Sequence, residues 1–126
     1  MLGSADLIAF VPTRDPGKAR EFYEKTLGLD FMSEDPFALV FNVQGTPLRI
    51  ANVSKVKDFK PAPFTIVGWQ VTDVSDMVGD LGKKGVQFER FPGMDQDANG
   101  IWKSPSGAKV AWFKDPDGNI LSITQA

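Results

Sequence analysis

The sequence contains no cysteine and no histidine. Without cysteine the chain can form no disulfide, no thiolate nucleophile and no cysteine-ligated metal site. Without histidine it lacks the commonest metal ligand in proteins and the commonest general base near neutral pH. A Ser–His–Asp mechanism is impossible for the same reason. These two absences exclude more classes of function than any other feature of the composition.

The chain also lacks a strong excess of either charge and any long apolar run. Its 14 basic and 16 acidic side chains give a net charge of −2, and the basic residues form no long run. Nucleic-acid binding therefore has little electrostatic support. No apolar segment approaches the roughly 20 residues of a membrane span, and the N-terminus does not resemble a secretory signal. We expect a cytoplasmic protein with no nucleic-acid and no membrane partner.

The most distinctive stretch is Asp115-Pro116-Asp117-Gly118-Asn119, which lies between the apolar, alternating runs 109–114 and 120–124. Asp-Gly between two such runs predicts the turn of a β-hairpin, because glycine tolerates the positive φ that tight turns require. Residues 38–50 can be aligned with residues 111–123 without a gap. The sequence therefore predicts two similar hairpins in a chain of 126 residues, which is the usual length of one domain.

The hairpins belong to a longer internal repeat. Asp15 and Asp73 are expected to cap helices that end at Gly28 and Gly85. We expect strands at 5–13, 29–33, 36–43 and 46–53, then at 64–72, 86–91, 109–114 and 120–124, with a candidate short strand at 101–104. One copy would bury only one face of its small sheet. A second copy is therefore expected, because two units together can bury more apolar surface. The polar segment 92–100 is a candidate lid, although an ordinary surface loop is the commoner structure.

These features resemble the vicinal oxygen chelate superfamily, which includes glyoxalases, extradiol dioxygenases, fosfomycin-resistance enzymes and bleomycin-resistance proteins. The resemblance is carried by DPGKAREFYEKTLGLDF, its fainter echo DVSDMVGDLGKKGVQF, and the closing AWFKDPDGNILSIT. It implies an α+β fold of two tandem βαβββ modules, which form a cupped, partly open mixed β-sheet with the helices on the outer face. The implied single domain spans 1–126, with module one at 5–53, a linker at 54–63 and module two at 64–126. It also implies a homodimer with the ligand site inside the cup.

The resemblance locates the positions at which metal-binding members hold their ion. Those members have a histidine seven residues before each helix-capping aspartate, and a carboxylate or similar ligand four residues after each hairpin glycine. These four positions hold Ile8, Ile66, Arg49 and Ser122. Isoleucine cannot coordinate a metal, serine is a poor ligand and arginine repels cations. We therefore expect no metal and no cofactor, which argues against glyoxalase, ring-cleaving dioxygenase and metal-dependent thiol-transfer activity.

Strand alternation places further residues on the face that carries these four positions. The ligand-binding residues predicted from this face and from the neighbouring loop are Ile8, Phe10, Arg49, Ala51, Ile66, Gly68, Gln70, Trp102, Ser122 and Thr124. Arg49 could hold a carboxylate or phosphate, although pairing with an acid such as Asp6, or exposure at a rim, is the commoner role for such a residue. Gly68 either leaves room for a ligand or accommodates packing.

Four aromatic residues, Phe10, Phe41, Trp102 and Trp112, are candidates for stacking on a planar ligand, although aromatic residues in strands more often belong to a core or an interface. The sequence favours a metal-independent small-molecule-binding protein, similar to bleomycin-type drug-binding members, with a partly apolar ligand that carries an anion if Arg49 anchors it. The alternative is a metal-independent enzyme of lyase or isomerase type on a small acidic or carbonyl substrate, with Asp6 moving a proton. A weaker alternative is a module that associates with another protein. The sequence identifies no catalytic residue.

Overall fold

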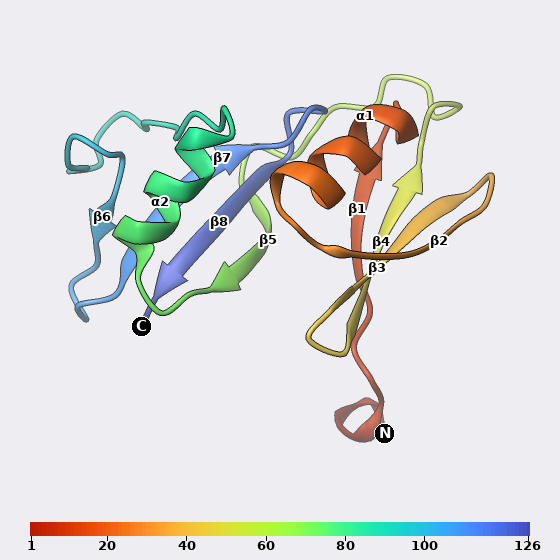
Figure 1. The fold of residues 1–126 in the computed structure, drawn as a ribbon, viewed down its shortest axis with the longest axis horizontal. Helices are drawn as coiled ribbons and strands as arrows, with labels where there is room; N and C mark the ends of the chain where they lie inside the picture. Colours follow the sequence, from red (N-terminus) through yellow and green to blue (C-terminus); the bar gives the residue numbers. More distant parts are fainter. The chain divides into compact units, whose positions relative to one another are not determined.

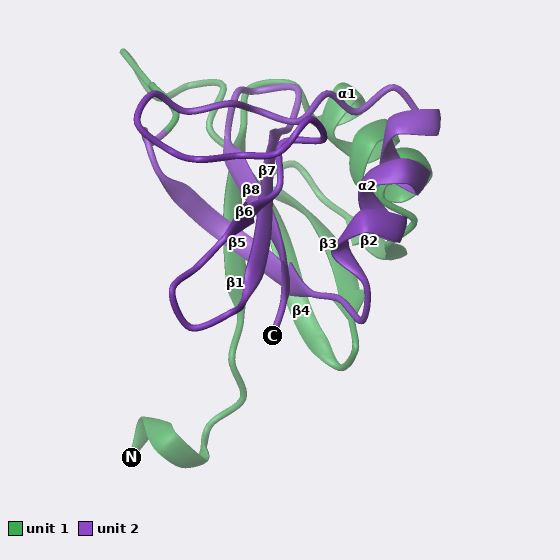
Figure 2. Cartoon of the chain, turned by 90° about the vertical axis from the view of Figure 1, so that its left-hand side faces the viewer, with its two compact units in different colours: residues 1–61 green, residues 62–126 purple.

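The computed structural model describes residues 1–126. The chain divides into two compact units, Met1–Pro61 and Ala62–Ala126 (Figure 2), and each unit contains one four-stranded sheet. The division falls within the segment 54–63 that the sequence indicates as a linker. No helix is long and apolar enough to cross a membrane. The two tandem βαβββ modules of the expected α+β fold are therefore confirmed.

The first unit has one helix and four strands after a short 3₁₀ turn (Figure 1). The elements are η1 (Leu2–Ser4), β1 (Ala9–Thr13), α1 (Pro16–Glu21), which continues as the π-helical turn η2 (Phe22–Thr26), β2 (Asp30–Glu34), β3 (Ala38–Val43) and β4 (Thr46–Asn52). The sheet order is β1-β4-β3-β2, with β1 parallel to β4. As predicted, Asp15 caps α1 by accepting a hydrogen bond from the backbone N–H of Lys18 at 3.2 Å.

The expected strand at 5–13 begins four residues too early. The ladder between β1 and β4 starts at the pair Ala9–Leu48, although β4 itself begins two residues earlier, at Thr46. Residues 5–8 therefore have no strand partner, and the side chain of Leu7 is 74% exposed. Alternation predicted an apolar residue here, but it could not show where the partner strand begins.

One face of the first sheet packs beneath its helix. The buried side chains on this face and on the helix are Val11, Leu39, Phe41, Leu48 and Ile50, together with Ala19 and Tyr23. The rings of Tyr23 and Phe41 lie 6.2 Å apart between centroids. Burial of each large apolar side chain contributes about 1.5–3 kcal/mol. Most of the hydrophobic stabilisation of this unit therefore comes from the face beneath the helix.

The second unit repeats the arrangement with a longer helix. Its elements are β5 (Thr65–Gln70), α2 (Val74–Lys83), β6 (Trp102–Lys103), β7 (Lys109–Lys114) and β8 (Ile120–Gln125), in the sheet order β5-β8-β7-β6. Asp73 caps α2, as predicted, by accepting a hydrogen bond from the N–H of Asp76 at 3.0 Å. The buried apolar side chains of the helix and the strands are Val74, Leu81, Ala111, Phe113, Ile120, Leu121 and Ile123.

The expected strand at 86–91 is wrong. Only one isolated bridge, between Phe88 and Phe113, ties this segment to the sheet, and the short strand β6 takes the edge position beside β7. The side chain of Gln96 accounts for the difference. It donates to the carbonyl of Glu89 at 2.9 Å and accepts from the N–H of Phe91 at 2.8 Å, so it occupies backbone groups that a strand partner would need.

The two hairpins differ in turn and register. In the first, Gln44 and Gly45 form a two-residue turn in which both φ angles are positive, 50° and 85°. In the second, the last pair is Lys114–Ile120, which leaves a five-residue connection. The ungapped alignment of the hairpins is therefore wrong by one residue along β7. It matches Trp112 to the buried Leu39, whereas Ala111 and Phe113 are the buried residues of β7.

The carboxylate of Asp115 organises the longer turn. Its Oδ1 accepts hydrogen bonds from the backbone N–H groups of Asp117 and Asn119, both at 2.9 Å, and its Oδ2 accepts one from Asn119 Nδ2 at 2.8 Å. Asp115 is only 6% exposed and Asn119 is fully buried. Hydrogen bonds to a charged acceptor contribute about 1.5–3 kcal/mol each, so this side chain fixes the connection between β7 and β8.

A second aspartate organises the connection between β2 and β3. Asp35 Oδ1 accepts hydrogen bonds from the backbone N–H of Phe37 at 2.7 Å and of Ala38 at 3.0 Å. These bonds stabilise the charged form and lower the pKa of the Asp35 carboxyl below its ordinary value, with a smaller contribution from the positive charge of Arg49. The exposed turn is therefore more stable when Asp35 is ionised.

We expect Asp115→Ala to lower the free energy of unfolding by about 2–4 kcal/mol, because it leaves buried N–H groups without an acceptor. Urea denaturation of the purified protein measures the change. Asp95→Ala is the matched control, since Asp95 is exposed and its carboxylate makes no hydrogen bond; it should change stability by less than about 0.5 kcal/mol. Equal effects of the two substitutions would contradict the role assigned to Asp115.

Asp35→Ala should destabilise the protein at neutral pH and have little effect in strong acid. The lowered native pKa means that the unfolded state binds more protons at intermediate pH. The stabilisation is therefore complete above the unfolded-state pKa and is lost as the pH falls through the native pKa. Thermal unfolding across this pH range measures the difference. Asp35→Asn keeps an acceptor oxygen but cannot titrate, so it should remove the pH dependence; a pH-independent difference for Asp35→Ala would refute the assignment.

Candidate functional site

The ten predicted ligand-binding residues fall into two groups, one in each unit. Ile8, Phe10, Arg49 and Ala51 belong to the first unit, and Ile66, Gly68, Gln70, Trp102, Ser122 and Thr124 belong to the second. In both sheets, the neighbours of these residues along each strand point toward the buried face beneath the helix. The predicted residues within the regular ladders therefore lie on the face without a helix, which we call the open face of each sheet.

The open face of the first sheet is apolar around a single cation. Phe10 pairs with Arg49 on β4, and Arg49 pairs with Val40 on β3, so the three share one row. Phe10 is 59% exposed. Ile8 lies just before β1 and is also exposed. The next row along the same face consists of Pro12, Ala51 and Ala38.

The guanidinium group of Arg49 makes no hydrogen bond or ion pair with the rest of the chain. The ion pair with Asp6 that the sequence suggested does not form. The positive charge of Arg49 instead contributes to the lowered pKa of Asp35. Arg49 is half-buried in a row with Phe10 and Val40. A planar guanidinium in such surroundings can bind a carboxylate or phosphate through two parallel hydrogen bonds.

The open face of the second sheet carries hydroxyl, amide and indole groups. One row contains Gly68, Ser122 and Trp112, and the next contains Gln70, Thr124 and Val110, with Trp102 beside Val110. The side chains of Gln70, Ser122 and Thr124 make no hydrogen bond within the chain. Each can therefore donate to or accept from a ligand without breaking an internal contact.

Gly68 accommodates a neighbouring side chain. A Cβ atom at this position would lie 2.5 Å from Ser122 Oγ and 3.3 Å from the carbonyl oxygen of Ser122. The space above Gly68 is thus occupied by the Ser122 hydroxyl, which decides between the two roles that the sequence left open. Ser122 is only 8% exposed. Its hydroxyl has room beside the sheet because residue 68 has no side chain.

Ile66 does not follow the regular ladder. Thr65 pairs with Ile120 and Val67 pairs with Leu121, so β5 has one extra residue at this point and forms a bulge. Simple alternation, which placed Ile66 beside Gly68 on one face, does not hold across a bulge. Instead Thr65 takes part in the open face, because its Oγ1 accepts a hydrogen bond from Trp112 Nε1 at 3.1 Å.

Trp112 is the main residue that the sequence-based site omitted. Its ring lies 6.1 Å from that of Trp102 and 5.5 Å from that of Phe91 between centroids. The ungapped alignment of the two hairpins matched Trp112 with Leu39, which is a core residue. Trp112 is one of the four aromatic candidates, but it is therefore not among the predicted ligand-binding residues. Among those four, Phe41 is fully buried and cannot stack on a ligand. The aromatic surface of the open face thus consists of Trp102 and Trp112, supported by Phe91.

The donor atoms do not fit a divalent metal. No group of three or more aspartate or glutamate side chains lies close enough to hold an ion anywhere in the 126 described residues. The residues at the four family positions, Ile8, Arg49, Ile66 and Ser122, supply one neutral hydroxyl and one cation. Such a set does not meet the preference of transition metals for imidazole, thiolate or carboxylate. The open faces can stack, hydrogen-bond and pair with an anion.

The sequence matches the family described as "Glyoxalase/Bleomycin resistance protein/Dioxygenase superfamily" over residues 5–123. No curated protein sequence matches the chain. A superfamily member from Sphaerobacter thermophilus DSM 20745 superposes with a TM-score of 0.77 at 24% identity, covering 100% of both chains. TnmS3, an antibiotic binding protein from Streptomyces sp. CB03234, gives 0.74 at 25% identity, covering 99% of this chain and 98% of TnmS3.

Lactoylglutathione lyase from Agrobacterium tumefaciens also has this fold, with a TM-score of 0.74 at 18% identity over 98% of this chain and 94% of the lyase. Binding proteins and enzymes therefore share the architecture, and the fold does not distinguish between them. The sequence match extends over almost the whole chain and includes both modules. This chain belongs to the glyoxalase/bleomycin resistance protein/dioxygenase superfamily.

Proposed function

We propose that this chain is a metal-independent small-molecule-binding protein, which holds a small, partly apolar ligand on the open face of a sheet and releases it unchanged. The observation that carries the proposal is the row formed by Gly68, Ser122 and Trp112. It offers an unpaired hydroxyl beside an aromatic surface, with no general base next to the hydroxyl. Such a row suits recognition of a planar ligand better than a chemical step.

The family comparison supports a binding role. TnmS3 is an antibiotic binding protein and is 25% identical to this chain over almost its full length. The absence of a metal-ligand set at the four family positions points in the same direction, since the metal-dependent reactions need donors that this chain does not supply. We expect the protein to work as a cytoplasmic homodimer.

Arg49 is the proposed anchor of an acidic group on the ligand. Its guanidinium is half-buried and has no internal hydrogen bond, so a ligand carboxylate would gain a charge-assisted contact without displacing another partner. Phe10 and Val40 on the same row exclude part of the surrounding water. The apolar residues of the first sheet's open face would then receive the uncharged part of the ligand.

Native mass spectrometry of the protein, purified without added metal, tests the binding proposal. We expect a dimer at the mass of two polypeptides or with an organic adduct, which denaturing extraction should recover unchanged after incubation. A stoichiometric transition metal would contradict metal independence. Recovery of a chemically altered adduct would favour the metal-independent enzyme over the binding protein.

Arg49→Met tests the anchor, because methionine keeps an apolar stem and removes the charge. With 1-naphthoate as the probe, calorimetry should show affinity falling about 10- to 100-fold, the range for a lost charge-assisted hydrogen bond. The methyl ester of the same acid should bind both proteins alike. Lys57→Met, in the exposed segment after β4, is the control for net charge and should leave both affinities unchanged. Equal losses for acid and ester would refute an anionic anchor.

A further inference from the structure

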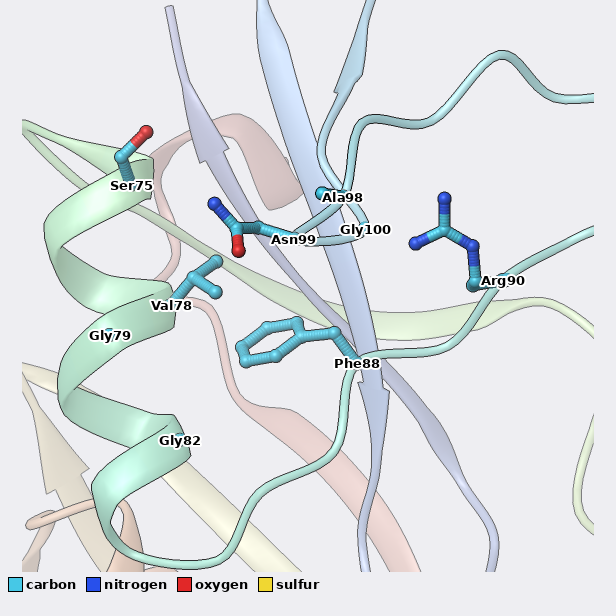
Figure 3. A pocket seen from close by; sticks show the side chains of 9 residues that line it. All are labelled: Ser75, Val78, Gly79, Gly82, Phe88, Arg90, Ala98, Asn99 and Gly100. Carbon is cyan, nitrogen blue, oxygen red and sulfur yellow. The ribbon is translucent and has the colours of Figure 1, made fainter.

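A cavity of about 370 Å³ lies in the second unit between α2 and the segment 88–100 (Figure 3). It is lined by Ser75, Val78, Gly79 and Gly82 on the helix and by Phe88, Arg90, Ala98, Asn99 and Gly100 on the other side. Phe88 bridges to Phe113, which belongs to the buried face of the sheet. The cavity is therefore on the helix side of the sheet, away from the open face. Its volume lies in the range of about 300–1,000 Å³ of small-molecule pockets.

The wall opposite the helix is held in place by side chains. Gln96 Nε2 donates to the carbonyls of Glu89 and Gly100, at 2.9 Å and 2.8 Å. Arg90 Nη2 donates to the carbonyls of Gln96 and Asp97, at 3.1 Å and 2.8 Å. These bonds join residues 89–90 to residues 96–100. The loop therefore has its shape before any ligand binds, which lowers the entropic cost of binding.

Polar groups that face the cavity are left without internal partners. The side-chain amide of Asn99 and the hydroxyl of Ser75 make no hydrogen bond in the chain. Figure 3 shows the amide of Asn99 and the ring of Phe88 reaching from the loop toward α2. The amide offers both a donor and an acceptor. A ligand that carries a carbonyl or amide group matches this set.

The helix wall presents bare backbone to the same space. Gly79 and Gly82 lie inside α2, and a Cβ atom added at either would meet no atom within 4 Å. Glycine destabilises a helix interior relative to alanine, and packing within this chain does not require it here. A flat group could approach the helix backbone closely at these two positions, opposite the ring of Phe88.

The charges around the cavity favour an uncharged ligand. Arg90 is the only charged side chain that lines it, and it disfavours a cation. The flanking carboxylates of the helix and the loop belong to Asp76, Asp80, Glu89, Asp95 and Asp97, against one further base, Lys83. This excess of carboxylates disfavours an anion. The surrounding charges therefore favour binding of neither an anionic nor a cationic ligand.

We propose that the cavity between α2 and the segment 88–100 is a second small-molecule site, which takes a small, planar, uncharged molecule bearing an amide or carbonyl group. The planar part lies between the bare helix backbone at Gly79 and Gly82 and the ring of Phe88. The carbonyl or amide group hydrogen-bonds to Asn99. This site is separate from the row of Gly68, Ser122 and Trp112 and does not depend on the function proposed for that row.

Titration of the ¹⁵N-labelled full chain with benzamide tests the proposal. Saturable chemical-shift changes should centre on Gly79, Gly82, Asn99 and Gly100. Benzoate, which has the same shape and a negative charge, and cyclohexanecarboxamide, which is not planar, should each bind more weakly. Absence of saturable shifts, shifts centred on Gly68 and Ser122, or equal binding of benzoate would each overturn the proposal.

Two variants separate binding from stability. Gly79→Ala should raise the thermal midpoint, because alanine favours the helix, and should weaken benzamide binding by about tenfold or more, because the new methyl occupies the ligand's space. Asn99→Ala removes an amide that makes no internal hydrogen bond, so it should leave the midpoint unchanged and weaken binding about three- to tenfold.

Gly17→Ala, in α1, is the matched control for the glycine substitution, since its new Cβ would make an ordinary contact of 3.5 Å with Asp15 Oδ1. It should leave benzamide affinity unchanged. Unchanged affinity in both Gly79→Ala and Asn99→Ala would refute the proposed site, whatever their effect on stability.

Discussion

The register of β7 against β8 is the constraint on which the second sheet depends. Side chains alternate between the faces of a strand, so a slip of one residue would exchange the two faces of β7 completely. It would place Trp112 beneath α2 and move Phe113 into the open. The five-residue connection held by the buried carboxylate of Asp115 leaves Lys114 opposite Ile120 and prevents this slip. One carboxylate therefore determines which side chains are available to a ligand.

The elements of the fold could be predicted from the sequence because their signals are local. Asp15 and Asp73 cap their helices as expected, and both hairpins form at their glycine-containing turns. The errors arise where a distant group decides the outcome. The segment 86–91 looks like a strand, but the side chain of Gln96 takes its backbone hydrogen bonds. The two hairpins have turns of different length, two and five residues. An ungapped alignment cannot represent this difference, so it misaligned β3 with β7 by one residue.

The same distinction applies to the candidate site. Alternation correctly grouped Phe10 with Arg49 and Gly68 with Ser122, since these pairs lie within regular ladders. It could not anticipate the bulge at Ile66, nor that the hydroxyl of Ser122 fills the space above Gly68. The resemblance to metal-binding proteins supplied positions, and elementary coordination chemistry shows that the side chains at them are poor metal ligands. The family therefore indicates where a ligand could bind, whereas the side chains at those positions indicate what kind of ligand it could be.

The glycines of the second unit have two different physical explanations. At position 68 a side chain would collide with Ser122 at 2.5 Å, so the chain's own packing requires glycine. At positions 79 and 82 the same test finds open space, although both residues lie within a helix that alanine would stabilise. No internal contact compensates for that cost. The ligand proposed for the cavity would account for this pair, because it would lie against the bare helix backbone at both positions.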